Sequence, residues 1–270
     1  MNKSLKPAFI LSILIAVFSF FVSLGGLFLN GLYRDNAFVR ATWLGNDAVT
    51  LLLGVPILAA ALFFAWRGSV KSQLIWMGML DYMLYNYAFY LFGATFNWFF
   101  LLYVILVGLS IFALIFGLSN LDAQNIRNSF SQKVPVRLIG GYFLFVASGL
   151  GLIYFAQSIQ FILTGQVPSI VTISGHVTNV VFALDLTLLV PWLVLGAVWL
   201  MQHKPWGYVI AGMLCVKGPL YTLILAVNTL LVIQRGLADG GELPLWIILT
   251  GLGLITSALF YGERQKPQRA

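Results

Sequence analysis

Charged residues are scarce in this sequence. Of its 270 residues, 9% are Asp, Glu, Lys or Arg and 60% are hydrophobic. A soluble globular protein carries about 25% charged residues. This deficit argues against a soluble enzyme, a disordered regulator and a nucleic-acid-binding protein. The mean hydropathy of +0.95 and the long uncharged runs instead predict an all-α fold, a polytopic membrane helix bundle.

Cysteine and histidine are also rare. The single cysteine, Cys215, excludes an intrachain disulfide and a multi-cysteine metal site, and we expect it to be a small buried residue. His176 and His203 fall on opposite sides of the predicted bundle, so they cannot share a metal or a haem. The H-E-x-x-H, D-x-x-D and P-loop motifs are all missing. We therefore expect no catalytic residue, no metal and no cofactor.

Eight segments are long and apolar enough to cross a membrane, for which a helix needs about 20 residues. They are residues 8–30, 48–66, 72–93, 96–119, 136–160, 179–202, 206–234 and 243–262. The first follows Lys3 and Lys6 and is longer than a signal-peptide core of about 7–15 residues, so we expect an uncleaved membrane helix. The outer segments 33–47 and 161–178 are interpreted as interfacial loops, or as loops folded over an outer vestibule.

Basic residues set the expected orientation. With the N-terminus inside, only Arg34, Arg40 and Arg235 lie on the outer side. Eleven basic residues lie on the inner side: Lys3, Lys6, Arg67, Lys71, Arg127, Lys133, Arg137, Lys204, Arg264, Lys266 and Arg269. This excess predicts a plasma (inner) membrane protein with both termini in the cytoplasm. We expect membrane lipids to be its constant partners, and the sequence leaves its oligomeric state open.

The two halves of the chain resemble each other. Thr50 to Pro56 matches Asp185 to Pro191, and Gly78-Met-Leu80 matches Gly212-Met-Leu214. Tyr103 to Leu109 likewise matches Trp246 to Leu252. These matches predict a parallel 4+4 internal repeat, with residues 1–119 and 136–270 as the two four-helix repeats and residues 120–135 as a cytoplasmic linker. Transporters built from parallel repeats hold their sites between the repeats near the bilayer midplane.

Three ionisable residues fall inside the predicted spans, where each charge is costly and marks a functional candidate. Asp81 and Lys217 both lie ~14–16 Å from the cytoplasmic surface at 1.5 Å per residue, so an ion pair between them is reasonable. Asp185 lies nearer the outer end of its span. Asp47 is interpreted as a helix N-cap, and we expect it to form an acidic outer mouth together with Asp185.

Polar and aromatic side chains accompany these charges. Tyr85 shares a helix face with Asp81, and Tyr221 and Asn228 share a face with Lys217, whereas Asn86 lies off the Asp81 face. Gly218-Pro219 should kink the helix beside Lys217. The aromatic run from Tyr82 to Phe100 is interpreted as an interfacial belt, or alternatively as the wall of a ligand site.

Two stretches resemble a family of uncharacterised bacterial multi-pass membrane proteins. One is Tyr85-Asn-Tyr-Ala-Phe-Tyr-Leu-Phe-Gly93 with Phe96-Asn97. The other runs from Asp185 and Pro191 through Lys204-Pro-Trp-Gly-Tyr208 to Lys217. The resemblance covers spans two to four and six to seven and implies a bacterial membrane protein. It implies no activity.

The sequence therefore predicts a membrane protein with a polar midplane site that binds or transports a small solute or ion, with proton coupling. The site residues are Asp81, Lys217, Asp185, Tyr85, Asn86, Tyr221 and Asn228. One alternative is a non-transporting sensor or assembly protein in which Asp81 and Lys217 form a structural pair. The other is a membrane-embedded enzyme, which the sequence leaves open without favouring it.

Overall fold

The computed structural model describes residues 5–262, and its elements in that range are helices. The first half contains α1 (Lys6–Phe28), α2 (Ala37–Val49), the π-helix η2 (Thr50–Gly54), α3 (Val55–Trp66), α4 (Val70–Gly93) and α5 (Phe100–Ser119). The short α6 (Ala123–Asn128) follows. The second half contains α7 (Val136–Thr164), α8 (Ser169–Ser174), α9 (Val180–Leu184), the π-helix η3 (Asp185–Leu189), α10 (Val190–Met201), α11 (Pro205–Gln234) and α12 (Leu243–Gly262).

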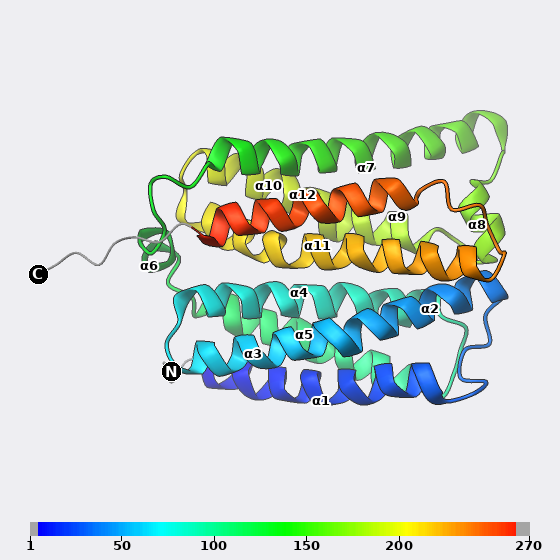
Figure 1. The fold of residues 1–270 in the computed structure, drawn as a ribbon, viewed down its shortest axis with the longest axis horizontal. Coiled ribbons are helices and arrows are strands. Elements are labelled where there is room, and N and C mark those ends of the chain that lie inside the picture. Colours follow the sequence, from blue (N-terminus) through cyan, green and yellow to red (C-terminus); the bar gives the residue numbers. More distant parts are fainter. Residues whose placement is uncertain (1–4, 263–270) are drawn as a thin grey trace, which may run out of the picture.

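The long helices run side by side along one axis (Figure 1). Helices α1 to α5 form one group and helices α7 to α12 form the other. Helices α4 and α11 pack against each other where the groups meet, and α2 also packs on α11. The first turn of α1 and the last turn of α12 lie at the same end of the molecule, the end that carries α6 (Figure 1). Lys3, Arg264, Lys266 and Arg269 lie outside the described residues.

Seven helical segments among the described residues are long and apolar enough to cross a membrane. They contain α1, α2 with α3, α5, α7, α9 with α10, α11, and α12. Helix α4 has 24 residues, enough for a crossing, and is not among the seven. It carries Gln73, Asp81 and Asn86, and most of its residues are buried by the other helices. A helix enclosed by protein in this way does not need an apolar surface on every side.

Proline explains the two π-helices. Pro56 and Pro191 each lack the N–H that would bond the carbonyl four residues earlier, and their rings crowd that carbonyl. The helix widens just before each proline, so Val55 N–H donates to Thr50 O and Val190 N–H donates to Asp185 O. Each wide turn directly precedes its proline, and the two prolines lie 135 residues apart in the chain. Wide turns of this kind are frequent at functional sites.

Helix α11 continues through Pro219 because a neighbouring helix compensates for the lost bond. Pro219 cannot donate to the carbonyl of Cys215, four residues earlier. The hydroxyl of Ser257 on α12 donates to that carbonyl instead. Lys217 therefore lies within a locally opened turn, between Cys215 and Pro219, whose free carbonyl is satisfied by protein, as the apolar core of a membrane requires.

The expected start of the second span and the expected loop at residues 33–47 both need correction. The second span begins at Ala37, not at residue 48, because Asn36 caps α2 by accepting the N–H of Val39 at 2.9 Å. Most of segment 33–47 is therefore helix, not an interfacial loop. Segment 161–178 contains the end of α7 and the short α8, and many of its apolar side chains are exposed, as expected of an interfacial segment.

The two halves are packed differently. Helix α1 packs closely along α5, whereas α7 and α12 hardly touch. Six of the 29 residues of α7 and three of the 20 residues of α12 are buried. Large apolar side chains cover the rest of both helices, as in a surface that faces lipid. Helices α7 and α12 therefore expose more of their surface than α1 and α5 do.

Candidate functional site

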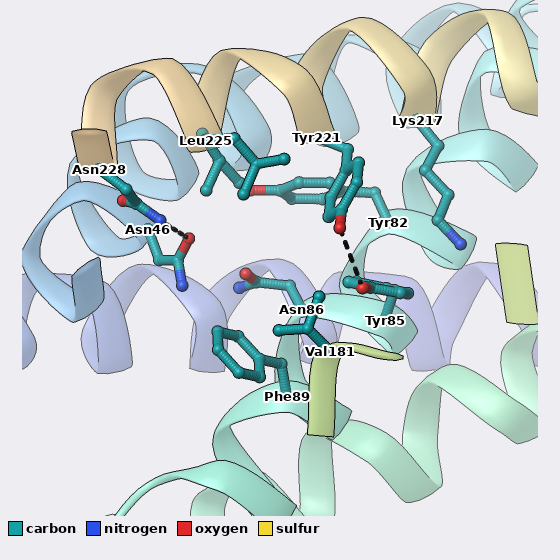
Figure 2. A pocket seen from close by; sticks show the side chains of 11 residues that line it. Asn46, Tyr82, Tyr85, Asn86, Phe89, Val181, Lys217, Tyr221, Leu225 and Asn228 are labelled. Atoms are coloured by element: carbon teal, nitrogen blue, oxygen red, sulfur yellow. Dashed lines mark hydrogen bonds between the residues drawn. The ribbon is translucent and has the colours of Figure 1, made fainter. Parts of the chain in front are cut away.

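A small cavity lies where the two groups of helices meet. Its volume is about 40 Å³. Because one water needs roughly 10–15 Å³ counted this way, the cavity has room for about three waters. Helices α2, α4, α9 and α11 supply its walls, and Figure 2 shows most of the lining side chains: Asn46, Tyr82, Tyr85, Asn86, Phe89, Val181, Lys217, Tyr221, Ile224, Leu225 and Asn228.

Asp81 and Lys217 form an ion pair between α4 and α11. The ammonium nitrogen of Lys217 lies 3.2 Å from each carboxylate oxygen of Asp81. It also lies 4.7 Å from the centre of the Tyr85 ring, within range of a cation–π interaction. The side chain of Lys217 is 1% exposed and that of Asp81 is 13% exposed. The pair offsets part of the free energy needed to bury each charge.

Asp185 is completely buried and bound by three tyrosines. The hydroxyl of Tyr85 donates to Oδ1 at 2.6 Å, and the hydroxyls of Tyr154 and Tyr221 donate to Oδ2 at 2.6 and 3.0 Å. Tyr85 lies on α4 of the first half, and Tyr154 and Tyr221 lie on α7 and α11 of the second half. One carboxylate therefore connects the two halves. Three hydroxyl donors favour the ionised form of a carboxyl group. Tyr85 joins this cluster to Lys217.

Asp47 is a second buried carboxylate of the same type. It is 1% exposed, and it accepts the Tyr33 hydroxyl at 2.5 Å and the Tyr90 hydroxyl at 2.9 Å. The N-cap role expected for Asp47 is wrong, because α2 begins ten residues earlier and Asn36 caps it. The expected acidic outer mouth is wrong as well. Tyrosines enclose Asp47 and Asp185 in separate clusters, and neither residue lines the cavity.

Tyr33 lies in the outer connection between α1 and α2. Burial, and secondarily the nearby Asp47 carboxylate, raises the pKa of the Tyr33 hydroxyl well above its ordinary value of 10.0. Tyr33 therefore keeps its proton and remains a hydrogen-bond donor to Asp47. The Asp47 carboxylate lies so close to Gly26 of α1 that a Cβ on that glycine would overlap it.

Buried carboxylates outnumber buried ammonium groups in this region. Asp81 is paired with Lys217, whereas within residues 5–262 neither Asp47 nor Asp185 forms an ion pair. A carboxylate buried at membrane depth without a cation is costly even when hydroxyls donate to it. Such a group gains stability when it binds a proton. The arrangement thus supplies two candidate sites for a proton.

The structure brings most of the predicted site residues together. Lys217, Tyr85, Asn86, Tyr221 and Asn228 line the cavity, Asp81 holds Lys217, and Asp185 binds the hydroxyls of Tyr85 and Tyr221. The sequence interpretation missed Asn46, which lines the cavity, and Tyr154, which reaches Asp185 from α7. A polar residue within an apolar run was the only available signal for either one.

The outer aromatic run splits into two populations. Tyr82, Tyr87 and Tyr90 are almost fully buried, and Tyr90 stacks on Trp43 with ring centres 4.5 Å apart. Phe92, Phe96 and Trp98 are more than 60% exposed. The exposed members fit an interfacial belt, and the buried members belong to the protein core.

Searches with this chain found no matching protein-family model, no matching curated protein and no matching solved structure.

Proposed function

We propose that this protein carries a small solute across a bacterial plasma membrane through the cavity between its halves, and that a proton moves with the solute. The observation that carries the proposal is the position of the cavity. It lies between helices of both halves and next to a buried ion pair and a buried carboxylate. Sites between repeats are typical of transporters built from parallel repeats.

The membrane topology forms part of this proposal. We infer eight crossings, with α4 as the eighth, a parallel 4+4 repeat, and both termini in the cytoplasm. The equivalent π-helices before Pro56 and Pro191 support the repeat. The end of the molecule that carries α6 would face the cytoplasm, because Arg127 lies in α6, and Lys133 and Lys204 lie in connections at the same end.

Asp185 is the proposed proton acceptor. Tyr154 donates to it from α7, a helix with few buried residues that packs mainly on α10, so a displacement of α7 would remove one of the three hydroxyl donors. Loss of a donor destabilises the ionised carboxylate and favours protonation. Lys217 and Asp81 would remain paired, and so neutralise each other, while Asp185 is protonated.

Proton flux into liposomes tests the proposal. The full chain is reconstituted around a trapped pH-sensitive dye, and a potassium diffusion potential drives proton uptake. The external buffer contains a mixture of small neutral, acidic and basic solutes, so that flux requiring a solute is also detected. We expect uptake well above that of protein-free liposomes, and at least a tenfold loss in D185N.

The matched control is D35N, which removes a carboxylate from the outer loop instead. Asp35 accepts hydrogen bonds from the backbone N–H and the hydroxyl of Thr95, and neither residue lines the cavity. We expect flux through D35N to equal that of the unmodified protein. Proton flux no faster than in protein-free liposomes would contradict the proton coupling, and full flux in folded D185N would contradict the role of Asp185.

A further inference from the structure

Three buried asparagines form one end of the cavity, and Lys217 lies at the other. Asn46, Asn86 and Asn228 are 2%, 4% and 7% exposed and come from α2, α4 and α11. Figure 2 shows the amide groups of Asn46 and Asn86 facing each other across the cavity. Amides at this depth are costly unless they are hydrogen-bonded. This end of the cavity is therefore built for polar contact.

Asn46 has an unused hydrogen-bonding group at the cavity. Its Oδ1 accepts the amide of Asn228 at 3.3 Å, and its buried Nδ2 has no protein partner. When the Asn228 amide is turned over, its nitrogen donates to the carbonyls of Thr42 at 2.9 Å and Ile224 at 3.3 Å. Asn46 can then turn over as well and present its oxygen. Either way one polar atom of Asn46 awaits a partner in the cavity.

The charges around the cavity disfavour an ionic occupant. Among residues 5–262, Lys217 is the only charged residue in the lining, and both oxygens of Asp81 already lie 3.2 Å from its ammonium. An anion would have to compete with Asp81 for Lys217. A cation would meet the Lys217 ammonium without finding a free carboxylate, because the oxygens of Asp185 are bound by tyrosines. Positive charge in a narrow polar passage excludes cations.

The size and shape of the cavity further limit which molecules can bind in it. The volume of about 40 Å³ matches only a few heavy atoms. Phe89, Val181, Ile224 and Leu225 form apolar walls beside the amides. Such walls suit a compact, flat molecule that has polar atoms at its edge. Asparagine amides provide both a donor and an acceptor, and they pair best with groups that offer the same.

We propose that the cavity takes a compact uncharged solute of the urea or short primary amide class, recognised by Asn46, Asn86 and Asn228. This inference rests on the proposed transport function and names its substrate class. The carbonyl and amino groups of such a solute would pair with the unused group of Asn46 and with the amide of Asn86, whose nitrogen also donates to the Thr50 hydroxyl at 3.4 Å. Its flat face would lie against the apolar walls.

Uptake of urea and guanidinium tests the substrate class, because the two have nearly the same planar shape and differ in charge. Initial rates for each radiolabelled compound are measured in liposomes containing the full chain and in protein-free liposomes, alongside acetamide. We expect the protein to accelerate urea and acetamide entry at least tenfold and guanidinium entry not at all. N46L, which replaces the amide with an apolar group of similar size, should lose most of the acceleration.

The matched control is S110A, which removes a buried polar group from α5, away from the cavity lining. It should retain the full urea rate. Equal acceleration of guanidinium, or a full urea rate in folded N46L, would overturn the substrate class. If N46L does not fold, the comparison of urea with guanidinium uptake by the unmodified protein still tests the proposed substrate class. Proton flux without urea or acetamide uptake would overturn this inference alone, and absence of both fluxes would overturn the proposed function as well.

Discussion

Single residues decide the stability of the region between the two halves. Lys217 and Asp81 each carry a charge that the other compensates, so removing one leaves an unpaired charge in a buried place. Asp185 depends in the same way on its three hydroxyl donors. Substitutions that preserve size but remove charge or a donor separate these contributions.

K217M should destabilise the protein by about 3–5 kcal/mol, because Asp81 would remain buried without its cation. Thermal unfolding in detergent measures the loss. The double variant D81N/K217M is the control, and it should recover most of the lost stability because no charge is left unpaired. A single variant as stable as the unmodified protein would show that the pair does not stabilise the fold.

Y154F should destabilise the protein by about 1.5–3 kcal/mol, the range for a hydrogen bond to a charged group. The matched control is Y142F on the same helix, whose hydroxyl donates to the neutral backbone carbonyl of Leu249 at 3.2 Å. That change should cost only about 0.5–1.5 kcal/mol. Equal losses of unfolding free energy in the two variants would argue that Asp185 is not ionised in the resting state.

At the scale of elements, the crossing of α4 and α11 carries the site. Gly78 lies one helical turn before Asp81, and a Cβ there would lie 2.8 Å from the carbonyl oxygen of Met213 and 2.9 Å from Cβ of Val216. The missing side chain lets the two helices approach closely, as small residues do between membrane helices. This approach brings Asp81 within reach of Lys217.

G78A should therefore separate α4 from α11 and destabilise the protein by about 1–3 kcal/mol through overpacking. G108A on α5 is the control, because a Cβ at that position has open space around it. Thermal unfolding compares the two variants, and urea uptake reports the geometry of the site. Unchanged stability in G78A would show that the crossing can widen without loss.

The outer connection should respond to pH. Burial lowers the pKa of His176 below its ordinary value of 6.5, and the nearby Asp35 opposes the shift only in part. The unfolded loop then binds more protons than the folded loop between the lowered pKa and 6.5, so stability is lost as the pH falls through that window.

Hydrogen exchange of residues 165–179 should accordingly become faster relative to intrinsic rates between pH 7.5 and pH 5.5. Asn36 holds this connection by donating to the carbonyls of Ile173 at 2.9 Å and Ser174 at 3.0 Å. H176Q, which cannot titrate in this range, should abolish the pH dependence. The same acceleration in H176Q would assign the effect to another group.

At the scale of the whole molecule, the arrangement of the halves determines which surfaces lie on which side of the membrane. The proposed eight crossings would return the chain to its starting side, and α1 begins at the end of the molecule at which α12 ends (Figure 1). The single buried cysteine makes this arrangement simple to test, because one substitution removes every native thiol.

In a C215A background, S169C should react with a membrane-impermeant maleimide added to intact cells, because Ser169 is exposed in the outer connection. Q132C lies in the connection after α6 and should react only after the cells are opened. Labelling is read by a mass shift of the protein. Labelling of Q132C in intact cells would reverse the proposed orientation, and labelling of both positions would contradict an ordered topology.

Composition and apolar run length were enough to predict a membrane helix bundle, because lipid imposes long apolar helices whatever the function. The expected ranges agree with most helix ends to within a few residues. The start of the second span was misplaced at residue 48 because residues 37–47 contain Arg40, Asn46 and Asp47, polar side chains that suggest a loop. Packing buries both residues. Asn46 lines the cavity, and Asp47 accepts hydrogen bonds from Tyr33 and Tyr90.

The sequence by itself determined that the protein is a membrane helix bundle and which polar residues are candidates for a site. It also determined the similar depth of Asp81 and Lys217, because the rise per residue fixes depth along a helix. Only the tertiary structure decided their partners. Rotation and packing of helices from different parts of the chain bring Tyr154 to Asp185, Tyr33 to Asp47 and Asn46 to the cavity. Those contacts depend on how the helices pack against one another, and no local pattern in the sequence records that.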